Sequence, residues 1–401
     1  MKILAINKYF YNKGGAETVF FQEREGLLEA GHSVVDFSMQ HQDNSPSPYS
    51  EYFTRCIDYH DRLSFFQKIN TAIRFVDSRE AVKKISALIL QEKPDIAHAH
   101  NIYHQLTPSI FPVLKKAGIP LVVTVHDAKL VCPNYVVFQH GEVCDACRKG
   151  GFGHVLWNDC QESFFKSTLM LVEALYHKWR KSYECVDLFL TPSAFYRDLI
   201  STRIPKNKIQ VLPNGVDLHS FTPRYDHDGY MLYVGRLSRE KGIETLLKAH
   251  QKLSPKPPLK IVGCGPLEAT LRNQTGDVEF LGFLSGQSLY DTIRGAACVI
   301  VPSEWYENCS MVVLEAMSMG KLVIGSRIGG IPEQIEDGKT GMLFSPGDVH
   351  QLADCMASAL ESPGKTGEMG QCARQRIHKI YDINRHMEKL LFYYDRVLYG
   401  N

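Results

Sequence analysis

The chain has 401 residues, of which 44% are hydrophobic and 22% are charged, a composition typical of a globular protein of about two domains. Its 45 Lys and Arg residues and 44 Asp and Glu residues give a formal net charge of +1, so no global field recruits nucleic acid. The N-terminus turns polar after one strand's length and no long apolar run occurs, so we expect neither a signal peptide nor a membrane-spanning helix. Eleven Cys residues without a secretory signal favour a reducing cytoplasm.

Strand-like and helical segments alternate along the first half of the chain. Lys2–Ile6 is predicted as a strand, a helical pattern follows it as far as Gly31, and Ser33–Phe37 is the next strand, which together make a βαβ unit. Further strands are predicted at 95–99, 120–125, 186–190 and 209–211, separated by helical segments at 65–91, 108–117 and 164–181. Such alternation predicts a parallel, doubly wound α/β sheet.

Two features follow predicted strands at the edge where open parallel sheets place ligands. Gly14 and Gly15 come after the first strand, and a diglycine lets backbone approach a bound group closely. A turn that simply needs positive φ explains this pair equally well. His126 comes directly after the strand at 120–125, and for this residue a hydrogen-bonded core histidine is the alternative to a ligand contact.

The segment at 128–163 contains four cysteines with one CxxC spacing, namely Cys132, Cys144, Cys147 and Cys160. Four thiolates can form a tetrahedral zinc site, but the usual second CxxC is missing. Free thiols and, in a less reducing compartment, disulfides are the alternatives. In each case we interpret the segment as a structural insertion and not as a catalytic centre.

The helical segment at 164–181 is mostly apolar and ends in the basic, aromatic cluster His177-Lys178-Trp179-Arg180-Lys181. A membrane-surface or lipid-acceptor role is one interpretation of such a cluster. We expect instead a core helix, because cations in the last turn also suit the helix dipole.

The second half of the chain repeats the same pattern after a linker that ends near Asp228. Predicted strands at 230–234, 259–262 and 278–281 each run into a glycine-containing turn. The first of these turns holds Arg236 and Lys241, two cations that could clamp a diphosphate or could be ordinary surface charges. The second turn holds Gly263 and Gly265, and the same architecture recurs there.

The stretch at 299–320 reads as a buried strand, a polar bend and an apolar helix. The helix carries one carboxylate, Glu315, although acids are almost never buried without a partner. Glu307 lies at the predicted tip of the bend, and the amides from Asn308 to Met311 would begin the helix, a position that favours phosphate. The alternative is that Glu315 pairs with a neighbouring cation and that Glu307 is merely exposed.

The order of several motifs along the chain resembles that of a known protein family. They are Gly14-Gly15-Ala16-Glu17, His126-Asp127, Thr191-Pro192-Ser193, Pro213-Asn214-Gly215-Val216-Asp217, Gly235-Arg236, Lys241-Gly242, Gly263-Cys264-Gly265-Pro266, Glu307 with Glu315, and Gly329-Gly330 with Glu333. With them, almost the whole chain resembles glycosyltransferase family 4, retaining nucleotide-sugar-dependent enzymes with the GT-B fold. The Cys-containing insertion is similar to that of many bacterial members that build exopolysaccharide or lipopolysaccharide.

The resemblance implies an α/β protein of two Rossmann-like, doubly wound domains that face a cleft. The acceptor-side domain would span 1–217, including the insertion at 128–163, and the donor domain would span 218–380. The C-terminal helix at 381–401 is amphipathic and would pack back on the first domain.

The resemblance also implies site residues. Catalytic roles would fall to His126, Glu307, Arg236 and Lys241. Donor binding would involve Gly14, Gly15, Arg236, Lys241, Gly263, Gly265, Phe283, Leu284, Asn308, Cys309, Ser310, Met311 and Glu315. In this scheme Glu315 holds the ribose hydroxyls, the two cations stabilise the leaving diphosphate, and His126 lies beside the donor sugar.

The implied activity is transfer of a hexose or N-acetylhexosamine from a UDP- or GDP-sugar to a glycan or lipid-linked saccharide. We expect no cofactor for catalysis, because no Asp-x-Asp manganese motif occurs at the expected place, and structural zinc is the one metal considered. The expected setting is the cytoplasm, or peripheral attachment to the inner face of the membrane. Cys309-Ser310-Met311 replaces the small Gly/Pro turn frequent in the family, which leaves the donor sugar open. A phosphorylase, an epimerase and a catalytically silent nucleotide-sugar-binding protein are the alternatives.

Overall fold

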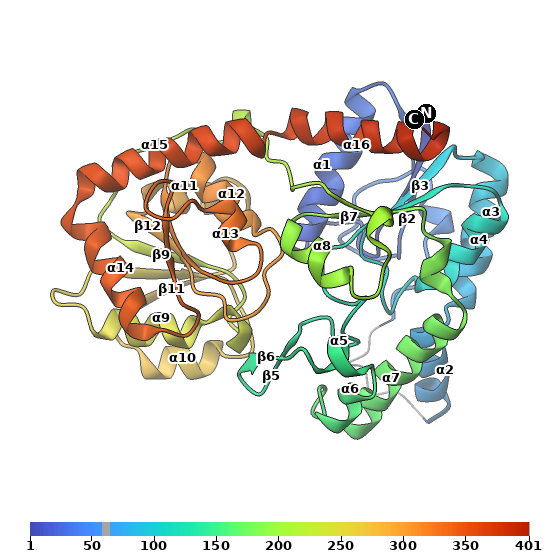
Figure 1. Cartoon of the computed structure of the whole chain (residues 1–401), viewed down its shortest axis with the longest axis horizontal. Helices are drawn as coiled ribbons and strands as arrows, with labels where there is room; N and C mark the ends of the chain where they lie inside the picture. The colour runs from blue at the N-terminus through green and yellow to red at the C-terminus, as the bar shows by residue number, and fades with distance from the viewer. Residues whose placement is uncertain (58–64, 401) are drawn as a thin grey trace.

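The computed structural model describes residues 1–57 and 65–400, which form two α/β domains that lie side by side (Figure 1). The sheet of the first domain is parallel, in the order β2-β1-β3-β4-β7-β8. Its strands are β1 (Lys2–Ile6), β2 (Ser33–Phe37), β3 (Ile96–Ala99), β4 (Leu121–Thr124), β7 (Leu188–Thr191) and β8 (Ile209–Val211). Its main helices are α1 (Gly15–Glu29), α2 (Phe65–Val76), α3 (Arg79–Glu92), α4 (Phe111–Lys116), α7 (Phe164–Trp179) and α8 (Ala194–Ile200).

The second domain repeats this architecture with a parallel sheet in the order β11-β10-β9-β12-β13-β14. The strands are β9 (Met231–Val234), β10 (Leu259–Val262), β11 (Val278–Gly282), β12 (Cys298–Val301), β13 (Leu322–Ser326) and β14 (Met342–Phe344). The helices are α9 (Ile243–Gln251), α10 (Glu268–Gln274), α11 (Gly286–Gly295), α12 (Met311–Ser318), α13 (Ile331–Gln334), α14 (Val349–Glu361) and α15 (Pro363–Ile380). Central strands such as β12 are buried throughout, because helices cover both faces of the sheet.

The last helix, α16 (Ile383–Tyr399), leaves the second domain and lies along the first, so that the two ends of the chain lie close together (Figure 1). Its buried Leu390 and Tyr394 pack in the same cluster as Ile3 of β1 and Phe20 of α1. The structure therefore confirms the predicted GT-B architecture of two doubly wound domains with a final helix that crosses back.

The insertion after β4 forms a small substructure at the edge of the first domain. It contains the hairpin β5 (Phe138–Gln139) and β6 (Glu142–Val143) and the short helices α5 (Ala146–Gly150) and α6 (His154–Trp157). The hairpin lies on the side nearest the second domain (Figure 1). The insertion therefore borders the region between the domains.

The expectation that α7 is a core helix is wrong. Its buried residues are Ser167, Met170, Glu173 and His177, whereas large apolar side chains on the helix are exposed, namely Phe164, Phe165, Val172, Leu175 and Trp179. The apolar face of the helix is thus turned to solvent, which composition alone does not predict. None of the described helices combines the length and the apolarity that a membrane crossing needs.

Candidate active site

The candidate residues follow strands at the topological switch point of each sheet, where the connections that follow two neighbouring parallel strands lead to opposite sides. In the first sheet this point lies between β1 and β3, and Gly14 and Gly15 follow β1. In the second sheet it lies between β9 and β12, and Arg236 and Glu307 follow these two strands. Both sheets therefore present their ligand-binding edges with predicted site residues on them.

Close backbone packing brings the loops of the second domain together. Gly242 has φ of +67°, and a Cβ there would lie 1.8 Å from the carbonyl oxygen of Pro302, so only glycine fits. The turn that ends in Lys241 is thereby held against the end of β12. Gly263 and Gly265 similarly lie against the backbone of Gly235 and Leu237, with room for no side chain.

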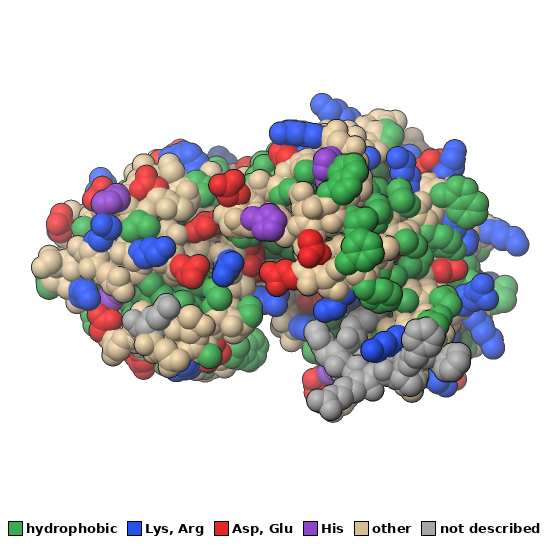
Figure 2. Space-filling view, turned by 90° about the horizontal axis from the view of Figure 1, so that it is seen from below, with side chains coloured by type: hydrophobic (Ala, Val, Ile, Leu, Met, Phe, Trp, Pro, Cys, Tyr) green, Lys and Arg blue, Asp and Glu red, His purple; other side chains and the backbone are tan. Residues whose placement is uncertain are grey.

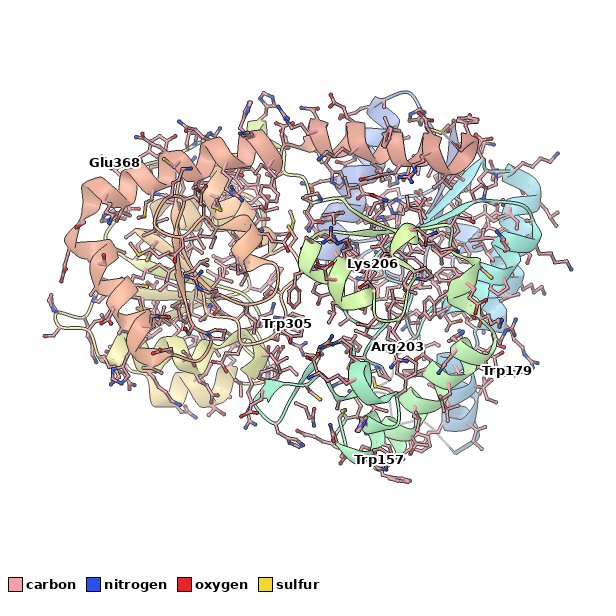
Figure 3. All side chains as sticks on the ribbon, in the orientation of Figure 1. Trp157, Trp179, Arg203, Lys206, Trp305 and Glu368 are labelled. Atoms are coloured by element: carbon pink, nitrogen blue, oxygen red, sulfur yellow. The ribbon has the colours of Figure 1, made fainter. Side chains whose placement is uncertain are left out.

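Glu307 is buried and accepts three hydrogen bonds on Oε1. The donors are Lys241 Nζ at 2.6 Å, Ser303 Oγ at 2.7 Å and Trp305 Nε1 at 2.9 Å. Burial alone would raise the pKa of Glu307, but the Lys241 charge and these hydrogen bonds outweigh burial and lower the pKa below its ordinary value. The predicted exposed loop tip is therefore a buried ion pair, with Trp305 between the two domains (Figure 3).

Glu315 on α12 has a different environment. The side chain is partly buried, and within the described residues its carboxylate has neither a salt bridge nor a hydrogen bond to another side chain. Burial raises the pKa of Glu315 to about 7. Tyr290 of α11 lies near enough for the carboxylate to raise the pKa of its phenol, after the larger effect of burial. Leu284 packs in the same hydrophobic cluster as Tyr290, and Phe283 is exposed.

Arg236 is exposed and forms no salt bridge within residues 1–57 and 65–400. Its charge reaches Tyr135 of the insertion, whose pKa is raised by burial and by Asp127 and lowered by Arg236. Arg236 therefore lies close enough to the insertion for its charge to act on Tyr135. Tyr135 is a site-lining residue that sequence reasoning missed, because no motif marked it.

The loop from 306 to 310 is fastened to the first domain. Asn308 Nδ2 donates to the Val125 carbonyl at 2.8 Å, and Asn308 Oδ1 accepts from Ser193 Oγ at 2.8 Å. Asn214 Nδ2 donates to the Cys309 carbonyl at 3.2 Å. The Ser310 amide, expected to face a ligand, already donates to Gln334 Oε1 at 2.9 Å.

A second fastening involves Glu333, which the sequence marked as a motif without a role. Its carboxylate accepts from the amides of Ala194 and Phe195, at 2.8 Å and 2.7 Å, at the start of α8. The amides at a helix start favour such an anion. In addition, a Cβ on Gly15 would lie 3.2 Å from Met311 Cγ, so the starts of α1 and α12 face each other across the domains.

His126 lies at this same interface and takes part in a buried polar network. Its Nε2 lies 2.9 Å from His100 Nδ1, and burial, with a smaller effect from the neighbouring His100, lowers the pKa of His126 to about 3. His98, His100 and Glu23 have ligand atoms within 4.8 Å of one another, a spacing that a metal ion could bridge. However, both ring nitrogens of His98 already contact hydroxyl groups, Tyr394 Oη at 2.7 Å and Thr124 Oγ1 at 2.8 Å.

The four cysteines of the insertion form no disulfide within the described structure. Cys132 and Cys147 are buried, and hydrogen bonding from Cys147 lowers the pKa of Cys132 to about 7. Cys144 and Cys160 lie near enough to raise the pKa of Cys147 further, after Cys132 and burial. The four thiols thus gather in one region, but within the described chain they do not form a group with metal-sharing spacing.

Comparison with protein-family models agrees with this geometry. The model described as "Glycosyltransferase Family 4" matches residues 13–220, and the model described as "Glycosyl transferases group 1" matches residues 217–376. The chain belongs to glycosyltransferase family 4. The two matches meet at the linker between the sheets, so each domain of this family 4 protein corresponds to one model.

Curated relatives cover part of the chain. The Arabidopsis thaliana sulfoquinovosyl transferase SQD2 is 33% identical over 232 residues, which are 53% of this chain and 45% of that protein. The glycogen synthase of Mycobacterium tuberculosis (strain CDC 1551 / Oshkosh) is 32% identical over 211 residues, which are 49% of this chain and 51% of that protein. The chain spans about half the length of these curated relatives.

Solved structures resemble the whole chain in fold. A sucrose-phosphate synthase from Thermosynechococcus elongatus superimposes with a TM-score of 0.74 at 20% identity, covering 100% of both chains. Anabaena Alr3699/HepE in complex with UDP superimposes with a TM-score of 0.65 at 17% identity, covering 98% of this chain and 100% of that chain. At such identities the likeness establishes the GT-B fold of this family 4 protein.

Proposed function

We propose that this family 4 protein is a retaining glycosyltransferase that moves a hexose or an N-acetylhexosamine from a UDP- or GDP-sugar to a saccharide acceptor. The observation that carries the proposal is that Arg236 and Glu315 are unengaged within the described residues, although both lie at the switch point of the second sheet. A free cation and a free carboxylate match the diphosphate and the ribose hydroxyls of a nucleotide sugar. The UDP-bound neighbour adds a consistent parallel, since that protein holds UDP on the same fold.

In the proposed mechanism the cations stabilise the leaving diphosphate. Lys241 donates one hydrogen bond to Glu307, and its ammonium has two further N–H groups that can donate to phosphate oxygens. Glu307 thus holds the Lys241 ammonium in place. We assign no protein base, and propose that the departing phosphate accepts the proton of the acceptor hydroxyl on the same face of the sugar. Arg236 and Lys241 supply the positive charge, so the transfer proposed needs no metal.

The test is turnover of a panel of UDP- and GDP-sugars by the wild type, Arg236→Ala and Glu315→Ala. We expect both variants to lose donor affinity and rate by about tenfold or more, because each loses a charge-assisted contact. Arg272→Ala is the matched control, since Arg272 forms an exposed pair with Glu268 on α10 of the same domain. Undiminished turnover in Arg236→Ala and Glu315→Ala would remove the proposed roles.

The same panel separates the alternatives. Release of free sugar phosphate would indicate a phosphorylase, and an epimerised donor without acceptor would indicate an epimerase. Calorimetric binding of a donor without turnover of any acceptor would indicate a silent nucleotide-sugar-binding protein.

We further propose that the acceptor is lipid-linked and that the protein attaches to the inner face of the membrane during polysaccharide or lipopolysaccharide synthesis. Exposed aromatic side chains support this, since Trp157, Phe164 and Trp179 are 76%, 74% and 79% exposed. Figure 2 shows hydrophobic side chains gathered on this face of the first domain, and Figure 3 shows both tryptophans pointing outward. Basic residues lie among them on and after α7, namely Lys166, Lys178, Arg180 and Lys181. Aromatic and basic residues together favour an anionic lipid surface.

A cavity of about 620 Å³ beside α7 adds to this proposal. Phe152 and Phe189 line its apolar part, and Lys178 and Arg203 lie at its polar part. Arg203 Nε is one of several described buried atoms without a hydrogen-bond partner. An anionic lipid headgroup in the cavity could accept a hydrogen bond from it.

Flotation with phosphatidylcholine vesicles, with and without phosphatidylglycerol, tests the attachment. We expect binding that requires the anionic lipid and that falls in Trp157→Ser and Trp179→Ser. Phe392→Ser is the matched control, because Phe392 is 59% exposed on α16 at the opposite edge of the domain. Equal flotation of all variants would contradict the proposed surface.

We also propose that Cys132, Cys144, Cys147 and Cys160 bind a structural zinc ion, on the strength of their CxxC spacing, although zinc would have to draw the four thiols closer together than they lie in the structure. Metal analysis of protein purified under reducing conditions checks it, and less than about half an equivalent of zinc would speak against the site.

A further inference from the structure

A chain of buried polar side chains links His126 to the C-terminal helix. Beyond the contact between His126 and His100, the Nε2 atom of His100 lies 3.3 Å from Glu23 Oε2. On its other oxygen, Glu23 lies 3.0 Å from His386 Nε2. Glu23 comes from α1, His386 comes from α16, and His100 follows β3. The tertiary fold therefore assembles one network from separate parts of the chain.

The partners of His386 fix its protonation state. Nδ1 lies 2.7 Å from the carbonyl oxygen of Pro213, which can only accept a hydrogen bond, so Nδ1 carries a proton. Burial would raise the pKa of Glu23, but the ring N–H groups of the histidines around it, among them His386 at 3.0 Å, outweigh burial and hold the pKa well below its ordinary value, so Glu23 is a carboxylate. Nε2 of His386 must then also donate. His386 is therefore an imidazolium that balances the buried Glu23 charge.

The same reasoning places the proton of His100. Its Nε2 faces a carboxylate oxygen, and a lone pair there would be repelled, so Nε2 carries the proton. Because His386 already balances the single charge of Glu23, a second imidazolium would leave an uncompensated buried cation. His100 is therefore neutral, and its Nδ1 is an acceptor. The proton between the two rings belongs to Nε2 of His126.

We propose that Glu23 and His100 are positioning residues that hold His126 with its proton on Nε2 and a lone pair on Nδ1. His126 Nδ1 has no hydrogen-bond partner within residues 1–57 and 65–400, so it is free to accept from a sugar hydroxyl. The inference rests on the proposed function, in which His126 lies beside the donor sugar. It also gives α16 a role at the site, because His386 supplies the charge that keeps Glu23 ionised.

The other groups around the network are compatible with this assignment. His98 lies 3.3 Å from Glu23 Oε2, and burial, with His100, lowers the pKa of His98 to about 3, so it adds no charge. Tyr394 contacts His98 from α16, and burial raises the pKa of its phenol well above the ordinary value, so it stays neutral. Phe20 packs edge-on against the His100 ring. Glu23 and His386 are thus the charged pair of the described network.

Nitrogen-15 NMR of histidine-labelled full-length protein tests the assignment without substrate. We expect His126 to carry its proton on Nε2 alone and His386 to carry both protons near neutral pH. In His100→Phe, which keeps a ring beside Phe20, His126 should lose its preference for carrying the proton on Nε2. In Glu23→Gln, His386 should lose one proton. A proton on Nδ1 of wild-type His126, or a neutral wild-type His386, would overturn the proposal.

Kinetics separate positioning from folding. We expect His100→Phe to lower kcat with the nucleotide sugar that the protein uses by about tenfold or more, with little change in KM. The reason is that His126 Nδ1 would be misoriented as a hydrogen-bond acceptor, while donor binding would not be lost. Asp36→Asn is the matched control, since Asp36 forms a buried pair with Arg24 at 2.7 Å away from the site. It should lower the melting temperature without moving the His126 signals. If His126→Asn leaves turnover unchanged, the proposed role of His126 fails while the NMR result still decides the tautomer.

Discussion

Donor affinity should depend on pH through Glu315. Burial raises the pKa of this carboxyl to about 7, and in the proposed mode of binding the ribose hydroxyls would donate to its ionised form. The dissociation constant should therefore rise as pH falls below about 7, and well below that pH it should rise about tenfold per pH unit. Between pH 8 and pH 6, on either side of the pKa, the total increase should be about tenfold, or about 1.4 kcal/mol. Glu307 and His126 do not titrate in this window, because the pKa of Glu307 is lowered and that of His126 is about 3.

Calorimetry with a nucleotide sugar is the assay, because its diphosphate carries no terminal phosphate that titrates near neutral pH. Binding near pH 7 should release about half a proton per protein, which titrations in buffers of different ionisation enthalpy would detect. Glu315→Gln should bind more weakly at high pH and should lose the pH dependence. A wild-type affinity that is flat between about pH 6 and pH 8 would refute the reasoning.

The same residue should oppose stability. Its pKa in the folded protein lies above the unfolded value, so the folded state favours the protonated form and loses stability as pH rises from about 4.5 to about 7. The loss is at most about 3 kcal/mol, and it is smaller because the side chain is partly exposed. Glu315→Gln should therefore raise the melting temperature at pH 8 and change it little at low pH.

Three further substitutions test the second domain. Lys241→Met should destabilise the protein by about 3 kcal/mol or more, since it leaves the buried Glu307 carboxylate without its cation. In the wild type, the stability from this ion pair should be lost as pH falls through the lowered pKa of Glu307. Denaturant unfolding measures both effects. Gly242→Ala should cost more than about 1 kcal/mol, because its Cβ would overlap the Pro302 carbonyl at positive φ, and unchanged unfolding would contradict the close packing. Arg236→Ala should keep wild-type stability while donor turnover falls, because the side chain is exposed, so a lowered melting temperature would show that Arg236 has a structural role.

Local patterns in the sequence were enough to predict the architecture. Apolar runs of strand length separated by helical periodicity require a parallel doubly wound sheet, and the turns after the strands place Gly15, Arg236 and Glu307 at one edge of each sheet. The same regularity made the amphipathic last helix recognisable.

Contacts between distant segments could not be predicted in this way. Lys241 and Glu307 are 66 residues apart and Asn308 and Val125 are 183 apart, and only the packing of loops and domains brings each pair together. His98 lies near the end of β3 and His100 directly follows the strand, but nothing local in the sequence joined them to a glutamate in α1. The solvent exposure of the apolar face of α7 likewise could not be predicted, because composition does not say which side of a helix packs against another element.

The sequence by itself determined which segments are strands and helices and which residues lie at the ends of strands, because these follow from short-range periodicity and backbone geometry. Only the tertiary structure decided which acid is paired and which is free. Glu307 meets a lysine and is ionised, whereas Glu315 meets none and its pKa rises. Charge and solvation depend on neighbours in space, and those neighbours are set when the two domains pack.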